Sequence, residues 1–389
     1  MKRIGIIDNL RDIPSFIGSQ FETVTAAQCM AATGGNTGNM IFAHAVRKIL
    51  GNPMTRVGWD WIPSKVRKRA DHLVICCANQ LGVHVDLGDW ADRLEKFELP
   101  VTLIGLGAQS DSLQIAPKIP TGTQRFLARV QALKGEADNN IAVRGNFTKD
   151  ILAELNVPSL AIGCPSLHIS PEPMLGQTII RGQALRSTER VAVLAGNPWH
   201  DPSAGLERVL VDIVNTYRSE YVLQHPEPML QFAFGEMDSI TPQDKARMQD
   251  VYGSSFSFDE LLEWYRRNAS VYLNPSSWLR SMRRFDLALG PRYHGVALAV
   301  QAGRPGCVIT IDSRTEELCL GTALKHISLD KAHCLDAEGL VRYALWTEDD
   351  AVRFDTARHA KAAAYCDFLQ ANSLEPSAHL RRLAKMVQR

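Results

Sequence analysis

Short apolar runs alternate with longer amphipathic stretches along most of the chain. The runs are rich in Val, Ile and Leu, as buried strands are, and the longer stretches repeat apolar positions every three or four residues, as helices do. In the first half the predicted strands are residues 3–7, 72–77, 100–104, 141–144 and 160–162. The predicted helices there are residues 40–50, 123–134 and 148–155.

The same alternation resumes after residues 169–189, a stretch that collects proline and glycine and loses its periodicity. The predicted strands of the second half are residues 190–195, 221–224, 271–273, 286–289 and 307–311. The predicted helices are residues 205–217, 258–268, 276–284, 294–303, 348–370 and 376–387, and the chain after residue 311 is also expected to become helical. Thr241 before Pro242 marks one further helix start, and Ser257 with Glu260 forms a capping box for another.

The pattern predicts an α/β protein, because strands that alternate with helices form parallel sheets covered on both faces. A chain of 389 residues is too long for one ordinary hydrophobic core. We therefore expect two Rossmann-like domains that face each other across a cleft: residues 1–170, a linker at 171–189, and residues 190–345. The last residues, 346–389, are predicted to form helices that could cross back to the first domain.

Composition narrows the classes of function. The formal charge of +1 gives no overall attraction to nucleic acid, so no nucleic-acid partner is expected. The eight cysteines form no C-x-x-C pair and are interpreted as free thiols of a reducing compartment, which favours the cytoplasm. The sequence shows neither a signal peptide nor a run of about 20 apolar residues. No metal is expected, because no histidine or carboxylate cluster has metal-ligand spacing.

The most informative segment is residues 286–312, which is predicted to form a strand, a tight turn, a helix and a strand. Arg292 and His294 follow the strand at a helix start, which is where ligands bind in open α/β sheets. The free N–H groups near Gly295 favour an anion, the Arg292 fork could hold a carboxylate or phosphate, and His294 can exchange a proton near neutral pH. In the alternative interpretation Arg292 pairs with a carboxylate and His294 is an ordinary turn residue.

A glycine-rich loop precedes the predicted helix at 40–50. Its residues Asn36, Gly38 and Asn39 could bring backbone N–H groups to a ligand in the cleft. A turn that caps the helix is the alternative. The loop is not a Walker loop, because no Gly-Lys-Ser/Thr follows it.

Two further strand ends carry candidate residues. Gly107 and Gln109 lie in a G-x-G loop without the third glycine of a dinucleotide fingerprint, so the loop is expected to line the cleft or simply to pack closely. Arg144 ends its strand and should face the crevice, unless it forms a surface salt bridge.

Basic residues cluster at 65–69 and again at Arg280, Arg283 and Arg284, beside Trp278. Solvated faces are the ordinary interpretation, and peripheral contact with a membrane surface is the alternative. Three isolated loop histidines near the predicted cleft are expected to be structural or solvated: His168, His200 and His225.

The ordered segments resemble the polysaccharide pyruvyl transferase family. NTGNMIFAHAVRKIL, from residue 36, is similar to the family's N-x-G-(D/N) loop and helix, and VTLIGLGAQS, from residue 101, is similar to its glycine loop. IAVRGNFTKDILAELNV, from residue 141, is similar to its V-R segment. DLALGPRYHGVALAVQAGRP, from residue 286, is the strongest match, to its D-x-x-(I/L)-(G/S)-x-R-x-H motif. Together the segments span residues 36–312.

The resemblance implies a fold like that of the GT-B glycosyltransferases and a pyruvyl transfer that needs no cofactor. Phosphoenolpyruvate would be the donor, and the acceptor would be a sugar of a polysaccharide or its lipid-linked precursor, so that the product is a cyclic ketal. Arg292, His294, Gly295 and Arg144 would bind the donor, with Arg292 and His294 acting in catalysis. The sequence leaves open an oligomer and a location at the inner face of the membrane.

The chain departs from the family pattern at three places. Cys76-Cys77-Ala78-Asn79 stands where a Gly-Gly pair is common, Cys164-Pro165 where Asp-Pro is common, and Asn39 where an acidic residue is common. These departures keep two rival functions open. One is a nucleotide-sugar-dependent glycosyltransferase on the same scaffold, with Glu316 or Glu317 as ribose ligand. The other is a degenerate family member that binds without catalysis.

Overall fold

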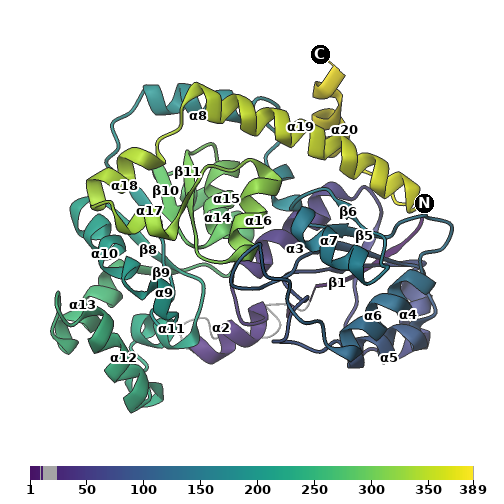
Figure 1. Ribbon diagram of the computed structural model, residues 1–389, viewed down its shortest axis with the longest axis horizontal. Coiled ribbons are helices and arrows are strands. Elements are labelled where there is room, and N and C mark those ends of the chain that lie inside the picture. The colour runs from purple at the N-terminus through teal and green to yellow at the C-terminus, as the bar shows by residue number, and fades with distance from the viewer. Residues whose placement is uncertain (9, 12–23, 389) are drawn as a thin grey trace.

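The computed structural model describes residues 1–8, 10–11 and 24–388, and it contains two six-stranded sheets (Figure 1). Neighbouring strands within both sheets are parallel. The first sheet consists of β1 (Ile4–Ile7), β2 (Met54–Arg56), β3 (His72–Cys76), β4 (Val101–Leu106), β5 (Ile141–Val143) and β6 (Leu160–Ala161). Its order is β2-β1-β3-β4-β5-β6, so the direction of winding reverses between β1 and β3.

The second sheet has the order β12-β11-β10-β7-β8-β9, and its winding reverses between β7 and β10. It consists of β7 (Val191–Leu194), β8 (Glu220–Leu223), β9 (Ala269–Val271), β10 (Leu287–Gly290), β11 (Gly306–Thr310) and β12 (His326–Ser328). A reversal of this kind opens a crevice at the carboxyl ends of the two strands, because the loops that follow them run to opposite sides of the sheet. The segment after β10 therefore lies at the crevice.

Helices cover the sheets because the strands are apolar on both faces, and every residue of β3, β4, β7, β10 and β11 is buried. The helices of the first half are α2 (Ala26–Thr33), α3 (Asn39–Ile49), α4 (Pro63–Arg69), α5 (Gly88–Phe97), α6 (Thr121–Ala132), α7 (Asn146–Glu154) and the short η2 (Pro165–His168). One cluster of buried apolar side chains is continuous from the first sheet to the second through α3 and α15.

The second half contains the remaining helices. They are α8 (Leu175–Ala184), α9 (Asp201–Ala204), α10 (Leu206–Thr216), α11 (Glu227–Phe234), η3 (Met237–Ser239), α12 (Pro242–Tyr252), α13 (Phe258–Asn268), α14 (Pro275–Met282), α15 (Tyr293–Gln301), α16 (Ser313–Thr322), α17 (Leu329–His333), α18 (Ala337–Ala344), α19 (Glu348–Ala371), α20 (Ala378–Ala384) and η4 (Lys385–Gln388). Two predicted start signals are confirmed. Thr241 caps α12, and Ser257 forms a capping box with Glu260 at α13.

Two predictions of local structure are wrong. Residues 171–189, expected to be irregular throughout, contain α8, whose Leu175 and Ile179 are buried and which packs on α19. The surrounding prolines and glycines hid this helix in the sequence, and Asp355 of α19 stabilises its start by accepting the backbone N–H of Gly176 at 2.7 Å. The stretch after 311, expected to be helical, also contains β12, which was too short to show a period.

The long helix α19 crosses back to the first half, as the sequence suggested (Figure 1). Near its start, Trp346 donates from Nε1 to the carbonyl of Gly306 in the second sheet at 2.9 Å. Further along, the buried Arg358 donates from Nε to the carbonyl of Leu167 at 2.8 Å. Tyr365 donates its hydroxyl to the carbonyl of Gly163 beyond β6, also at 2.8 Å. The helix thus joins the two sheets from outside and confirms an α/β fold of two halves, as in GT-B enzymes.

Candidate active site

A pocket opens where loops from both sheets meet at the carboxyl ends of their strands. The space among its lining residues is about 440 Å³, with the open solvent at its mouth included. The residues that line it are Asn36, Asn39, Ala78, Asn79, Arg144, Gln224, Pro291, Arg292, Tyr293, His294, Arg314, Thr315 and Leu318. The segments singled out in the sequence before α3, at the end of β5 and before α15 therefore converge on one site.

Arg292 lies at the N-cap of α15, and only 5% of its surface is exposed. Its Nε donates to the carbonyl of Ala195 at 3.1 Å, and Nη2 donates to the carbonyls of Gly196 and of His225, the latter at 3.2 Å. Nη1 bonds to Nε2 of His225. Of the five guanidinium N–H groups, these contacts use four, counted over the described residues. The fork that was expected to face a ligand therefore holds the loops after β7 and β8.

Burial also affects the charge of Arg292. Loss of solvation and the neighbouring Arg314 lower the pKa of Arg292 to about 9, so it remains protonated at neutral pH. The buried carboxyl of Glu207, which accepts hydrogen bonds from the hydroxyls of Tyr221 and Tyr252, partly offsets this effect. Arg292 is thus a buried cation at the floor of the pocket.

Arg144 has the opposite arrangement. It directly follows β5, is 2% exposed, and donates from Nε to the carbonyl of Gly105 at 2.8 Å. Its Nη1 and Nη2 donate to no residue in the described ranges, its side chain lines the pocket, and its Cζ lies 5.9 Å from the centre of the Phe42 ring. The alternative of a surface salt bridge is therefore wrong for Arg144. Burial lowers the pKa of its guanidinium, which nevertheless stays charged at neutral pH, and its charge is directed to the cavity.

His294 lies in the first turn of α15, half-buried between the ring of Phe42, 5.6 Å away, and that of Tyr293. Its Nε2 lies 3.7 Å from Sγ of Cys164. Loss of solvation, together with the charges of Arg144 and Arg314, holds the pKa of His294 well below its ordinary value. The imidazole is therefore uncharged at neutral pH, and an anion bound among these cations would raise its pKa.

Gln224, which follows β8, was not anticipated from the sequence. It is 1% exposed, and its carbonyl accepts the N–H of Thr37 at 3.2 Å. Its side chain fits between two glycines, because a Cβ on Gly38 would lie 2.5 Å from its Oε1 and a Cβ on Gly295 would lie 2.7 Å from its Nε2. The glycines before α3 and in α15 therefore let two helix starts approach one amide. Over the described residues, Nε2 of Gln224 and Oγ1 of Thr37 have no hydrogen-bond partner.

We expect Gly295→Ala to destabilise the protein by about 1–3 kcal/mol, because the new methyl group would overlap Leu194 and Gln224. A Cβ at this position would lie 2.5 Å from Cδ1 of Leu194. The matched control is Gly182→Ala in α8, where a Cβ meets nothing within 4 Å. This substitution should stabilise the protein by up to about 1 kcal/mol, because alanine favours a helix more than glycine does. Denaturant unfolding of both variants measures the difference, and an equal effect at the two sites would contradict the close packing of Gly295.

The remaining predicted cleft residues fall into two groups. Asn36 and Asn39 line the pocket, and Asn39 donates from Nδ2 to the carbonyls of Thr33 and Gly34, at 3.0 and 3.1 Å. An acidic side chain could not donate these bonds, so asparagine closes the loop before α3. Gly107 and Gln109 are set back from the cavity: Gly107 lies against the Arg144 side chain.

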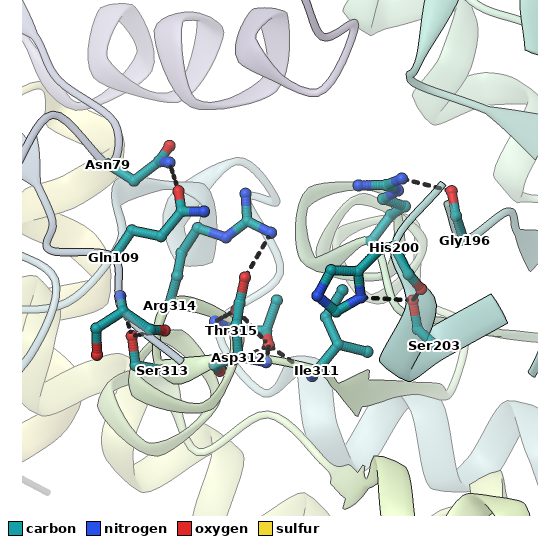
Figure 2. Close-up of polar contacts among 12 residues, drawn as sticks. Asn79, Gln109, Gly196, His200, Ser203, Ile311, Asp312, Ser313, Arg314 and Thr315 are labelled. Carbon is teal, nitrogen blue, oxygen red and sulfur yellow. Dashed lines mark hydrogen bonds and ion pairs between the residues drawn. The ribbon is translucent and has the colours of Figure 1, made fainter. Parts of the chain in front are cut away.

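Figure 2 shows Gln109 accepting a hydrogen bond from Asn79, which itself lines the pocket. The loops after β3 and β4 are thereby joined at the rim. Figure 2 also shows Arg314 rising from the start of α16 beside Gln109, with Asp312 at its base and His200 beyond Asp312. Nη2 of Arg314 lies 3.1 Å from Oδ2 of Asp312, while its buried Nε has no partner among the described residues. Arg314 was not predicted as a site residue, because an arginine in the first turn of a helix carries no local signal of a ligand site.

Glu317 of α16 connects the two halves. Its carboxylate accepts the backbone N–H and the hydroxyl of Thr148 at the start of α7, each at 2.7 Å. Ser313, at the start of α16, accepts the N–H of Ser110 at 2.9 Å. Both oxygens of Glu317 are thus engaged by protein groups, which counts against its candidacy as a ribose ligand, and Glu316 does not line the pocket.

The three loop histidines have protein contacts. His168 is fully buried edge-on against the ring of Tyr365. Nδ1 of His200 lies 2.8 Å from the hydroxyl of Ser203. His225 contacts Arg292, so it shapes the pocket floor without lining the cavity. These positions agree with the expected structural roles.

The described ranges hold neither of two further features. None of the described helices is both long and apolar enough to span a bilayer. No group of three or more His, Cys, Asp or Glu side chains in these ranges is arranged to hold a metal ion.

Two parallel α/β halves with a cationic pocket between them define a protein of the GT-B architectural class. The model of the family described as polysaccharide pyruvyl transferase matches residues 36–313. The chain therefore belongs to the polysaccharide pyruvyl transferase family, and the resemblance of its motifs is confirmed.

Two solved structures align with nearly the whole chain at low sequence identity. The UDP-GlcNAc 2-epimerase from Neisseria meningitidis bound to UDP-GlcNAc is 10% identical, with 91% of this chain and 94% of that chain covered and a TM-score of 0.43. The glycosyltransferase SnogD from Streptomyces nogalater is 14% identical, with 100% and 99% covered and a TM-score of 0.34. No curated protein matches the sequence significantly.

Proposed function

We propose that this protein transfers a pyruvyl group from phosphoenolpyruvate to a sugar, forming a cyclic ketal on a polysaccharide or its lipid-linked precursor. The observation that carries the proposal is the free guanidinium end of Arg144, which borders a pocket that also contains Arg314 and His294. Phosphoenolpyruvate has two anionic groups, a phosphate and a carboxylate. A pocket with several inward-facing cations suits such a ligand, because charge-assisted hydrogen bonds to it are strong.

The geometry leads us to divide the roles of the arginines. Arg144, with both terminal nitrogens available, is proposed to hold one anionic group in a bidentate manner, and Arg314 is proposed to hold the other. Arg292 keeps one N–H for a ligand and chiefly fixes the start of α15, whose free backbone N–H groups near Gly295 favour an anion. Gln224 lines the same pocket, and its Nε2 has no hydrogen-bond partner among the described residues.

The proposed reaction adds two hydroxyls of the acceptor to one carbon of the donor. The methylene carbon of phosphoenolpyruvate gains a proton, which leaves an oxocarbenium-like centre at the adjacent carbon. One hydroxyl oxygen forms a bond to that centre and loses its proton. The bond to the phosphate oxygen then breaks, the second hydroxyl closes the ring, and its proton leaves with the phosphate. The products are the ketal and inorganic phosphate.

His294 is proposed to transfer the proton in this reaction. Its ring is proposed to take up a proton when the phosphoenolpyruvate binds, to give that proton to the methylene carbon, and to accept the proton of the attacking hydroxyl at the nitrogen so freed. Arg144 and Arg314, the same cations that lower its pKa, would be neutralised by the bound donor. The imidazolium would then be more stable, so that His294 could pass the proton on to carbon or phosphate.

Ligand-dependent thermal unfolding tests the donor. With phosphoenolpyruvate at about 100 times its dissociation constant, binding should add about 2.7 kcal/mol to stability and raise the unfolding temperature by a few degrees. Inorganic phosphate should act more weakly, since it offers one anionic group, and UDP- and GDP-sugars should have no effect. If only a nucleotide-sugar raised the unfolding temperature, the glycosyltransferase alternative would be favoured. If none of these ligands raised it, a degenerate binder would be favoured.

The acceptor and the place of the reaction are also part of the proposal. A lipid-linked acceptor would bring the protein to the inner face of a membrane. The helix α4 has exposed Lys65, Lys68 and Arg69 and no acidic residue, and Ile62 beside it is 56% exposed, which suits an anionic lipid surface. The second basic cluster suits it less, because its apolar Trp278 is buried. Sedimentation with anionic and with neutral vesicles tests this contact.

A further inference from the structure

Among the described residues, the charged groups that act on His294 are two arginines, and no carboxylate is one of them. Arg144 reaches it from the end of β5 and Arg314 from α16, and their charges act on its ring. Phe42 of α3 and Tyr293 of α15 flank the ring. Among the described residues, the side chain that is hydrogen-bonded to the His294 ring is that of Cys164. Its Sγ lies 3.7 Å from Nε2 of His294. A histidine used for proton transfer is commonly oriented by an acidic or carbonyl partner, and here the partner is a thiol.

The direction of this hydrogen bond follows from the other contact of the sulfur. The hydroxyl of Ser166 donates to Sγ of Cys164 at 3.1 Å. Burial raises the pKa of the Cys164 thiol, although Arg144 opposes this effect, so the thiol keeps its proton at neutral pH. Because the sulfur already accepts from Ser166, its own S–H is free to donate, and Nε2 of His294 is the acceptor within reach.

We propose that Cys164 is a positioning residue that fixes the tautomer of His294. Its S–H donates to Nε2, so the ring proton resides on Nδ1. Nδ1 bonds to no residue in the described ranges and is not among the fully buried polar atoms, so it is the nitrogen open to the pocket. The pocket therefore presents an N–H donor on a neutral ring. The tautomer does not depend on the proposed function. A hydrogen bond from Nδ1–H to an oxygen of phosphoenolpyruvate does rest on the proposed function.

A thiol and a carboxylate at position 164 would have opposite effects on the ring. A thiol leaves the imidazole neutral, whereas a carboxylate close to Nε2 would favour the imidazolium. The residue at 164 thus sets whether the site begins the reaction with a neutral or a charged His294. The two neighbouring arginines favour the neutral ring, so the thiol and the cations act in the same direction.

Nitrogen-15 spectra of ligand-free protein labelled at histidine test the tautomer. The chain has 11 histidines, so the signals of His294 are assigned by their loss in His294→Gln. The wild-type ring should show a protonated Nδ1 and an unprotonated Nε2. Cys164→Ala should lose this single tautomer, while Cys307→Ala, which removes another buried thiol, should keep it. A protonated Nε2 in the wild type, or an unchanged ring in Cys164→Ala, would overturn the proposal.

The pH dependence of the same signals tests the choice of a thiol. In Cys164→Asp the folded-state pKa of His294 should rise, so the ring should be charged at low pH and lose its proton as the pH increases through about 5.5–8. In the wild type the ring should stay neutral over this range. Cys164→Ser, whose hydroxyl can also donate, should retain the wild-type tautomer and serves if the aspartate variant does not fold. Titration of the wild-type ring within this range, or loss of the tautomer in Cys164→Ser, would refute the assignment. Since no ligand is present, a failure to bind phosphoenolpyruvate leaves these results unaffected.

Discussion

Arg144→Ala should fold and yet lose its stabilisation by phosphoenolpyruvate. The variant removes the guanidinium end, whose Nη1 and Nη2 donate to none of the described residues, and with it the two charge-assisted hydrogen bonds proposed to hold the donor. At about 1.5–3 kcal/mol each, their loss should weaken donor binding by about 10²–10⁴-fold. The measurement is the rise in unfolding temperature on adding phosphoenolpyruvate, compared with the rise that the wild type shows at the same concentration.

Two other arginines make this result specific. Arg125 lies on α6, where it is exposed and paired with Asp92 at 2.6 Å, so Arg125→Ala should keep the full ligand-induced shift. Arg292→Lys should instead unfold at a lower temperature without any ligand, because the lysine cannot replace the bonds to the carbonyls of Ala195, Gly196 and His225. A full shift in Arg144→Ala would remove Arg144 from the donor site.

His294→Gln should lower the rate of ketal formation by about 10²–10⁴-fold, which is the usual contribution of a positioned proton-transfer group. Donor affinity should change much less, because glutamine keeps a hydrogen-bond donor and the cations Arg144 and Arg314 remain. Separate measurement of kcat and of the KM for phosphoenolpyruvate, through the release of inorganic phosphate, distinguishes the two effects.

The control for this variant is His200→Gln. Figure 2 shows His200 beyond Asp312, with its ring in contact with the hydroxyl of Ser203, and His200 does not line the cavity. Its replacement should leave kcat close to that of the wild type. If both histidine variants lost activity equally, or if His294→Gln retained it, proton transfer by His294 would be ruled out.

Much of the fold could be predicted because its signals are local. Helix α13 has the bounds that the sequence indicated, since a capping box starts it and its apolar positions repeat regularly. The strand β10, the turn after it and α15 were also identified from glycine, proline and apolar residues over a short range. Two elements that the sequence did not predict, α8 and β12, lack such signals. Helix α8 is bordered by prolines and glycines, and strand β12 has only three residues.

The candidate site was predicted less completely. Arg144, His294, Asn36 and Asn39 line the pocket, as placement at strand ends and helix starts led us to expect. Arg314 and Gln224 were missed, although each also follows a strand. Dozens of polar residues in a parallel α/β chain follow strands, and a single sequence does not show which of their side chains turn inward.

By itself the sequence determined the alternation of strands and helices, the turn that places Arg292 and His294 at the end of a strand, and the family. These features depend on residues close together in the chain, where periodicity and turn chemistry act directly. Only the tertiary structure decided which arginine is free. The loops after β7 and β8 surround Arg292 with carbonyl groups, whereas the terminal nitrogens of Arg144 are left facing the pocket. It also brought Cys164 to His294 across 130 positions of sequence, because contacts of that range depend on how two sheets pack together.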